Sequence, residues 1–373
     1  MREVSFILQQ LTAHRRALHR IPELDKNLPK TKDYLLSQLA PLHCRIIEPE
    51  NCAVLSFFDA GKPDTAAFRS DMDALPIKEK TGLDFCSGHP GQMHACGHDG
   101  HMAMLLCLAE YVDAHLTELP RNVLLVFQPA EETTGGARDI CRTGVFPALN
   151  VRHIFGIHLW PDLPAGVIGT RSGPMMARSS EATVEIIGKS AHIAKWQEGT
   201  DALAAAAEFI RRAYDMADSE LPADWYRVFK FGRMQSGTVR NAVSAHTLLE
   251  GTLRTFQDEA FDHITHRAAE IGREIEQETG CRFSVRFSEG YPPVYNDPAL
   301  YDRVSAALGP DGFVPLPVPA LIAEDFSFYQ QVLPGLFFFL GTGGDQPLHS
   351  DRFQFDEAVL EQGVFLYQKL LWI

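Results

Sequence analysis

The spacing of apolar residues changes along the chain, and the changes predict where helices and strands lie. Apolar positions three and four residues apart predict helices at residues 4–20 and 102–115. Short, nearly continuous apolar runs predict buried strands at residues 52–58, 65–70, 123–127 and 153–159. Because these strands alternate with helices, we expect an α/β domain with a doubly wound, largely parallel sheet.

The middle of the chain has a different order of elements. A strand at 183–187 precedes an alanine-rich helix near 200–217, and strands near 226–234 and 247–255, a helix at 259–278 and a strand at 282–287 follow. This β-α-β-β-α-β order is that of the ferredoxin-like motif. We therefore expect an α+β domain at residues 179–290, inserted into a domain formed by residues 1–178 and 291–373. An uncovered sheet edge in the insertion would allow pairing with a second copy of the chain.

The last part of the chain returns to the first domain. A helix, a phenylalanine-rich strand at 336–340 and a final helix are expected there, and the proline-rich interval 310–319 is predicted to be a loop.

Composition narrows the class of protein. The chain has 373 residues, 45% hydrophobic and 22% charged, with a formal net charge of −14. Without a basic patch, no nucleic-acid partner is expected. Seven scattered cysteines do not resemble a disulfide framework, and the N-terminus lacks the long apolar core of a signal peptide. No segment reaches the roughly 18 apolar residues of a membrane helix, so we expect a cytoplasmic protein with no membrane partner.

An eight-residue run, His94 to His101, carries three imidazoles, a thiol and a carboxylate around two glycines. Cys96 and His98 are two residues apart, so in an extended loop both side chains would point the same way. Glycines allow the backbone to fold closely around an ion. The alternative is a buried apolar cysteine with capping or surface histidines.

Further possible ligands follow expected strands, near the carboxyl ends where ligands bind in such sheets. Asp71, Glu131, Glu132 and His158 lie at these ends. The groups that could converge are Cys96, His98, one of Glu131 and Glu132, His158 and His349. Thiolate, imidazole and carboxylate together suit zinc, manganese, nickel or cobalt better than calcium or magnesium. Five ligands exceed what one catalytic zinc takes, but two ions bridged by one ligand would use them all.

The adjacent glutamates suit a hydrolytic metal centre. Such a centre needs one carboxylate to hold the ion and another to take a proton from bound water. The alternative is that Glu131 and Glu132 begin a helix and stabilise its positive end.

Several motifs together resemble the M20 metallopeptidase family, in particular its amidohydrolase branch of hippurate hydrolases, auxin-conjugate hydrolases and N-acetyl-diaminopimelate deacetylases. The resemblance covers nearly the whole chain. It is carried by residues 18–24 (LHRIPEL), 69–76 (RSDMDALP), 94–101 (HACGHDGH), 128–132 (QPAEE), 156–161 (GIHLWP), 324–326 (EDF) and 348–350 (LHS).

The resemblance implies a centre of two divalent ions, zinc or manganese in the first place and nickel or cobalt as alternatives. It implies that Cys96 bridges the ions and that the remaining ligands are His98, Glu132, His158 and His349. Glu131 would be the general base. Asp71 and Asp73 would orient ligands, although capping of loops is the alternative role for both.

The resemblance also gives the inserted domain the roles of a lid and of a dimer interface, which makes the expected protein a homodimer. His192 resembles a histidine that reaches the partner subunit's active site and stabilises the oxyanion. Asn241 and Arg254 resemble a pair that contacts the substrate's carboxylate. The loop after His192 (residues 193–199, IAKWQEG) and the residues after Asn241 depart from the branch's usual pattern, which affects the choice of substrate.

The expected reaction is the hydrolysis of a small-molecule N-acyl, in particular N-acetyl, amino acid to a carboxylate and a free amino acid. The unusual loop at residues 193–199, together with residues 288–293 (SEGYPP), favours an N-acetyl-diaminopimelate-type deacetylase. One alternative is an aminopeptidase or dipeptidase of the wider family. Another is a non-catalytic binding protein that keeps the fold.

Overall fold

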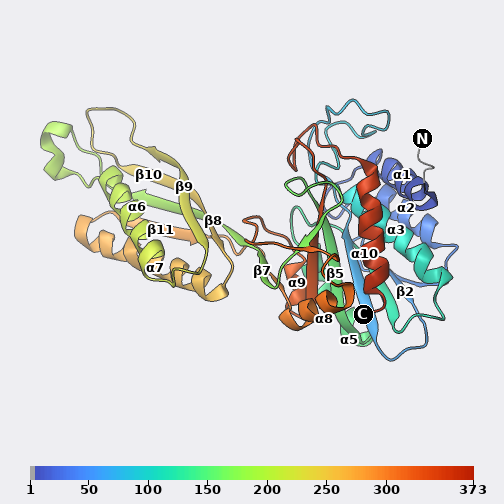
Figure 1. The fold of residues 1–373 in the computed structure, drawn as a ribbon. Coiled ribbons are helices and arrows are strands. Elements are labelled where there is room, and N and C mark those ends of the chain that lie inside the picture. Colours follow the sequence, from blue (N-terminus) through green and yellow to red (C-terminus); the bar gives the residue numbers. More distant parts are fainter. Residues whose placement is uncertain (1–4) are drawn as a thin grey trace. The chain divides into compact units, whose positions relative to one another are not determined.

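A computed structural model describes residues 5–373. The chain divides into two compact units, each described here by itself (Figure 1). The larger unit ends its first segment at Met175 and resumes with Tyr295–Pro319 and Asp325–Ile373. The smaller unit comprises Met176–Val294 and Ala320–Glu324.

The larger unit is built around an eight-stranded sheet with the order β1-β2-β4-β3-β5-β14-β6-β13. These strands are β1 (Arg45–Ile47), β2 (Val54–Phe58), β3 (Thr65–Asp71), β4 (Asn122–Gln128), β5 (Val151–Trp160), β6 (Ile168–Thr170), β13 (Val314–Pro315) and β14 (Gly335–Gly341). The four central strands β4, β3, β5 and β14 run parallel. The pairs β1–β2, β2–β4 and β6–β14 are antiparallel. The sheet is therefore mixed: the runs predicted at 65–70, 123–127 and 153–159 form strands of its parallel centre, whereas the run at 52–58 forms the antiparallel strand β2.

Helices cover both faces of this sheet. They are α1 (Phe6–His19), α2 (Pro29–Leu39), α3 (His98–Ala114), α4 (Gly136–Arg142), α5 (Val145–Ala148), α8 (Pro298–Leu308), α9 (Ser327–Gln330) and α10 (Leu360–Leu370), with a short 3-10 helix η2 (Glu357–Val359). Neighbouring residues of β14 show the two faces, because successive strand side chains point to opposite sides. Phe337 packs on Phe326 just before α9, whereas Phe338 packs on Phe313.

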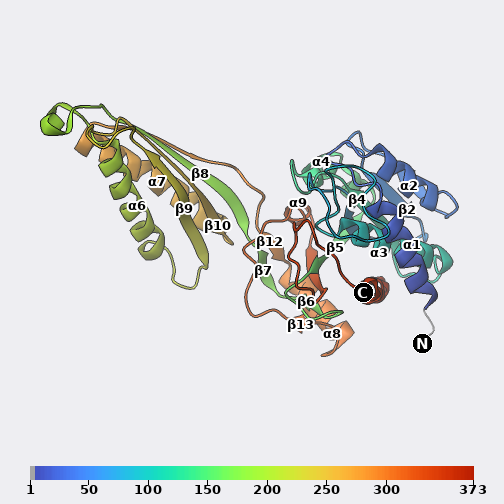
Figure 2. The same ribbon diagram turned by 90° about the horizontal axis from the view of Figure 1, so that it is seen from above.

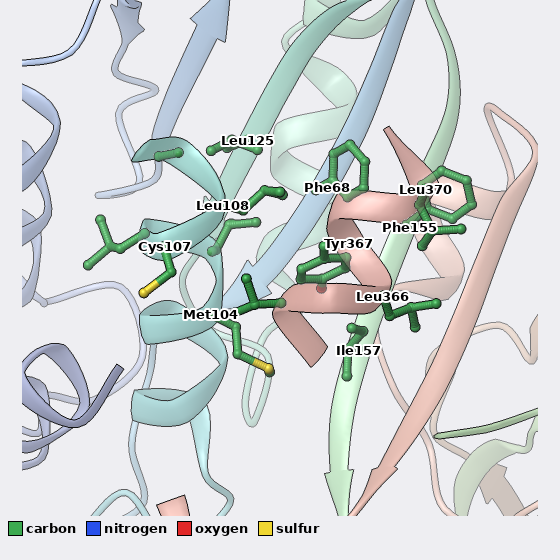
Figure 3. Close-up of a cluster of buried hydrophobic side chains, with 14 of the residues drawn as sticks. Phe68, Met104, Cys107, Leu108, Leu125, Phe155, Ile157, Leu366, Tyr367 and Leu370 are labelled. Carbon is green, nitrogen blue, oxygen red and sulfur yellow. The ribbon is translucent and has the colours of Figure 1, made fainter. Parts of the chain in front are cut away.

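The main hydrophobic core lies between the sheet and the helices α3 and α10, which cover one of its faces (Figure 3). Phe68 of β3 contacts Phe155 of β5 and the ring of Tyr367 on α10. Met104 and Leu108 of α3 are fully buried in the same cluster. A helix that is apolar on most sides must be enclosed by other elements, and α3 packs against α1, α10 and the strands β3, β4 and β5.

The smaller unit is a four-stranded antiparallel sheet with the order β11-β8-β10-β9. Its strands are β8 (Arg178–Ile187), β9 (Arg227–Ser236), β10 (His246–Thr255) and β11 (Arg282–Phe287), with helices α6 (Ala202–Ser219) and α7 (Asp258–Thr279) and a 3-10 helix η1 (Ile193–Glu198). Figure 2 shows both long helices beside this sheet, and they pack against one another. The element order β-α-β-β-α-β is the one that the sequence pattern predicted.

Three details differ from the sequence-based expectations. The helix predicted at 102–115 begins four residues earlier, at His98. The interval 310–319, predicted to be a loop, contains the two-residue strand β13. Short strands β7 (Gly173–Met176) and β12 (Val294–Asn296) form a small separate sheet that no apolar pattern predicted. Among the described residues, every helix is too short or too polar to cross a bilayer.

Candidate metal centre

The fold brings the predicted ligands to one edge of the central sheet. Asp71 is the last residue of β3, and Glu131 and Glu132 lie in the turn that follows β4. His158 lies two residues before the end of β5. Because β3, β4 and β5 run parallel, these positions meet at the same edge. The helix alternative for the two glutamates is wrong, since α4 begins only at Gly136.

Gly97 fixes the geometry of the octapeptide. Its φ of 85° lies in the left-handed region, and a Cβ atom there would come within 2.7 Å of Leu159 Cδ1. Only glycine meets both constraints without strain. The chain therefore turns sharply between Cys96 and His98, and His98 lies in the first turn of α3. The extended loop assumed for these two residues is thus wrong, yet the turn still brings both side chains into one cluster.

The donor atoms of the predicted ligands converge. Cys96 Sγ lies 3.4 Å from His158 Nε2. Glu132 Oε1 lies 3.2 Å from His349 Nε2 and 3.9 Å from His98 Nε2. The ligand atoms of Cys96, His98 and Glu132 all lie within 4.8 Å of one another. All five side chains of the predicted ligand set therefore belong to one continuous cluster.

Two of the histidines are oriented so that one ring nitrogen remains available. The Nδ1 atom of His98 donates to the carbonyl of Asp73 at 2.8 Å, and that of His158 donates to the carbonyl of Leu159 at 2.7 Å. Each Nε2 then carries a lone pair that points into the cluster. His98 Nε2 is buried with no hydrogen-bond partner among the described residues. Buried polar atoms are rarely left unpaired, so this donor set fits bound divalent cations.

His349 closes the cluster from the loop that precedes η2. Its backbone N–H donates to the carbonyl of Ala95 at 2.9 Å, which ties the loop to the octapeptide. Its φ of 63° is unusual for a residue with a side chain. The His349 side chain is 52% exposed, whereas that of His98 is fully buried. His349 therefore marks the side from which solvent or a substrate reaches the cluster.

Asp73 ties two parts of the site together. Its carboxylate accepts the backbone N–H groups of Glu131 and Glu132 at 3.0 and 3.1 Å. Its carbonyl accepts the proton of His98 Nδ1. Asp73 thus caps the glutamate turn and orients His98, so the two roles considered for it occur together. Burial, together with the charge of Glu132, raises the pKa of Asp73 well above its ordinary value.

The surroundings of Cys96 and His158 determine which of their protonation states is favoured. Burial and the nearby charges of Glu132 and Glu131 raise the pKa of the Cys96 thiol well above its ordinary value. Burial lowers the pKa of His158 to about 3, so its ring is neutral. A neutral imidazole is a good ligand, but the thiol must lose its proton to bind metal. Positive charge at the cluster would supply that stabilisation.

Asp71 belongs to a buried network that the sequence reasoning did not resolve. Its Oδ1 atom accepts the Nδ1 proton of His101 at 2.6 Å, and its Oδ2 atom accepts Arg69 at 2.9 Å. Arg69 also donates to Asp325 and to Gln128. All of these residues lie in the motifs singled out in the sequence, but their pairing depends on the fold.

The three predicted residues of the smaller unit form two separate groups. His192 and Ala242 form a β-bridge, and the N–H of Ile193 donates to the carbonyl of Asn241 at 3.0 Å. His192 and Asn241 are therefore neighbours at one end of the sheet, and both are exposed. Arg254 lies near the far end of β10, eight residues beyond its first residue, His246. That length of strand spans roughly 26 Å, so one chain cannot bring Asn241 and Arg254 to the same carboxylate.

Comparisons with known proteins give the family of the chain and its similarity to a dinuclear metal binding peptidase. The model of peptidase family M20/M25/M40 matches residues 67–372. An N-acetyldiaminopimelate deacetylase from Lacticaseibacillus casei is 36% identical, with 94% of each chain covered, and one from Limosilactobacillus fermentum is 33% identical, with 95% covered. The crystal structure of the Bacillus subtilis YXEP protein, a dinuclear metal binding peptidase, matches with a TM-score of 0.85 at 31% identity, over 98% of this chain and 97% of that one.

Proposed function

The chain belongs to peptidase family M20/M25/M40, and from this membership and the site we propose that it hydrolyses the amide bond of N-acyl amino acids. The ligands of two divalent ions would be Cys96, His98, Glu132, His158 and His349. The products would be a carboxylate and a free amino acid. As the narrower proposal, the substrate is an N-acetylated diaminopimelate-type amino acid, because relatives of 33–36% identity carry the name N-acetyldiaminopimelate deacetylase.

One observation carries the proposal. The donor atoms of side chains from distant parts of the sequence meet in one cluster, and the fully buried His98 Nε2 has no hydrogen-bond partner there among the described residues. A cluster that only stabilised the fold would leave this atom paired. Cysteine and histidine ligands favour zinc among the divalent metals considered, with manganese, nickel and cobalt as alternatives.

The adjacent glutamate supplies the proton chemistry. Bound metal would lower the pKa of a water molecule and polarise the substrate carbonyl. Glu131 would accept the proton of that water and pass it to the leaving amine. The backbone N–H groups of Glu131 and of the neighbouring Glu132 both donate to the Asp73 carboxylate. The Glu131 carboxylate is buried and close enough to Cys96 to affect the pKa of the thiol, which supports this role.

The smaller unit would complete the site with groups from two chains. The Nδ1 atom of His192 accepts the N–H of Ala194 at 3.1 Å, so Nε2 carries the proton and can donate to a developing oxyanion. His192 and Asn241 lie far from Arg254 within one chain. A site that uses all three residues therefore needs a homodimer, in which one chain supplies His192 and Asn241 and the other supplies Arg254.

Replacement of the general base tests the proposal. Glu131→Gln keeps the shape of the side chain but removes the proton acceptor. We expect the variant to retain the wild-type metal content and to lose at least about 100-fold in kcat. Wild-type turnover by this variant would refute the assigned base.

A substrate panel separates the classes of function. The metal-loaded wild type should hydrolyse N-acetyl amino acids, N-acetyl-diaminopimelate among them, faster than the matching benzoyl compounds and unblocked dipeptides. Faster cleavage of dipeptides would favour an aminopeptidase or dipeptidase. Full metal loading without any hydrolysis across the panel would favour a binding protein on the same fold.

A further inference from the structure

His101 lies among the proposed ligands, but both of its ring nitrogens are already engaged. Nδ1 donates to Asp71 Oδ1 at 2.6 Å, and Nε2 accepts the backbone N–H of Leu159 at 3.0 Å. An imidazole that accepts a backbone N–H must be neutral at that nitrogen. His101 could bind a metal only by releasing Leu159, which would leave a buried N–H unpaired. Although its ligand atom lies within 4.8 Å of those of His98 and His158, His101 is therefore not a ligand.

The peptide groups of Leu159 connect His101 with a proposed ligand. The N–H of Leu159 donates to His101, and the carbonyl of Leu159 accepts the Nδ1 proton of His158. The two rings are 4.7 Å apart at an interplanar angle of 63°. Leu159 is fully buried, and its side chain packs against the turn at Gly97. His101 thus fixes the segment that sets the rotation of the His158 ring.

On its Nδ1 side, His101 contacts a buried hydrogen-bond network that begins at Asp71. Asp71 is held by Arg69, whose guanidinium also donates to Asp325 Oδ1 at 2.9 Å and to Gln128 Oε1 at 2.8 Å. Gln128 donates in turn to both carboxylate oxygens of Asp325. Each of these side chains is at most 1% exposed. A network this dry and fully paired holds its members in one arrangement.

We propose that His101 is a positioning residue of the metal centre, which transmits the rigidity of the Arg69–Asp71 pair through Leu159 to His158. The inference rests on the proposed function, because it assumes that His158 binds metal. Residues that orient metal ligands through hydrogen bonds typically change metal affinity 10- to 100-fold. The contact with Leu159 carries the effect, whereas the contact with Asp71 fixes the tautomer of His101.

Two amide variants separate this role from a general contribution to stability. Asparagine at position 101 places its amide near the site of Nδ1 and loses the bond to Leu159. Glutamine places its amide near the site of Nε2 and can still accept the Leu159 N–H. His94→Gln is the matched control, because His94 is a buried histidine of the same octapeptide that belongs to none of the groups of converging ligand atoms found among the described residues.

The measurement is zinc affinity, obtained by competition between metal-free full-length protein and a chromophoric chelator. We expect His101→Asn to bind zinc roughly 10- to 100-fold more weakly than wild type, His101→Gln to lose less, and His94→Gln to match wild type. Equal affinities for the two His101 variants, or wild-type affinity in both, would overturn the inference and leave the proposed function intact. Failure of the wild type to bind zinc would overturn the proposed function, and this inference with it.

A measurement on the unaltered protein covers the case in which the variants do not fold. In ¹⁵N spectra of histidine-labelled, metal-free wild type, His101 should show a protonated Nδ1 and an unprotonated, hydrogen-bonded Nε2. Protonation at Nε2 would show that Leu159 is not held by this ring and would overturn the inference.

Discussion

The turn at Gly97 offers a sharp test, because the chain contains a matched second glycine. Gly97 precedes α3 with φ 85° and ψ 14°, and Gly144 precedes α5 with φ 74° and ψ 12°. The two backbones are nearly the same, but the surroundings differ. A Cβ atom on Gly97 would lie 2.7 Å from Leu159 Cδ1, whereas one on Gly144 would meet nothing within 4 Å.

The two alanine variants should therefore differ by the cost of the steric contact alone. A left-handed backbone costs an alanine about 1–2 kcal/mol at either position. Overpacking of a well-filled site adds about 1–3 kcal/mol. In the free energy of unfolding, we expect Gly144→Ala to lose only the backbone term and Gly97→Ala to lose the backbone and the overpacking terms. Because the displaced Leu159 also orients His158, Gly97→Ala should bind metal more weakly, and Gly144→Ala should not.

Thermal unfolding and zinc competition of the two variants, each compared with wild type, provide the measurements. For a chain of 373 residues, a difference of about 1–3 kcal/mol lowers the Tm of Gly97→Ala by roughly 1–4 °C relative to Gly144→Ala. Equal melting temperatures, or equal zinc affinities, would refute the argument that the Gly97 turn is packed tightly against Leu159.

Two further predictions concern stability and assembly. Burial opposes the charge of His19, but Asp99 and Glu79 raise its pKa to about 9. The charged ring therefore stabilises the fold fully below pH ~6.5, and this contribution to the free energy of unfolding is lost as the pH rises through about 9. Denaturant unfolding of His19→Gln should show a flatter pH dependence between these values, and a profile like that of wild type would contradict the ion pairs. The variants Asn241→Ala and Arg254→Ala should each be inactive alone. After subunit exchange, a mixture of the two should regain about a quarter of wild-type activity, because half of the dimers then carry one intact site of two. No recovery in a mixture shown to contain heterodimers would contradict a site shared by two chains.

Much of the fold followed from apolar periodicity alone. The central strands β3, β4 and β5 begin or end within two residues of the predicted runs, because buried parallel strands need continuous apolar sequence. The start of α3 was missed because its first turn consists of His98, Asp99, Gly100 and His101, which have no amphipathic pattern. Two-residue strands such as β13 carry too few side chains to produce a pattern.

The site was predictable as a set of residue types but not as a set of bonds. His98 and His101 belong to one octapeptide, and the spacing that favoured His98, two residues after Cys96, assumed an extended loop that the structure does not have. Their roles differ because His98 Nε2 faces the cluster unpaired, whereas His101 Nε2 accepts the amide of Leu159. The separation of Asn241 from Arg254 follows from the length of β10, because Asn241 precedes the strand and Arg254 lies near its far end.

We propose that the Cys96 thiolate would hold both divalent ions of the centre. Anomalous diffraction from crystals of zinc-loaded protein, measured above and below the zinc edge, tests it directly. We predict two peaks per chain with Cys96 Sγ between them, each about 2.3 Å from the sulfur, and with His158 and His349 among the surrounding ligands. A single peak, or two peaks from which the sulfur is remote, would contradict the account.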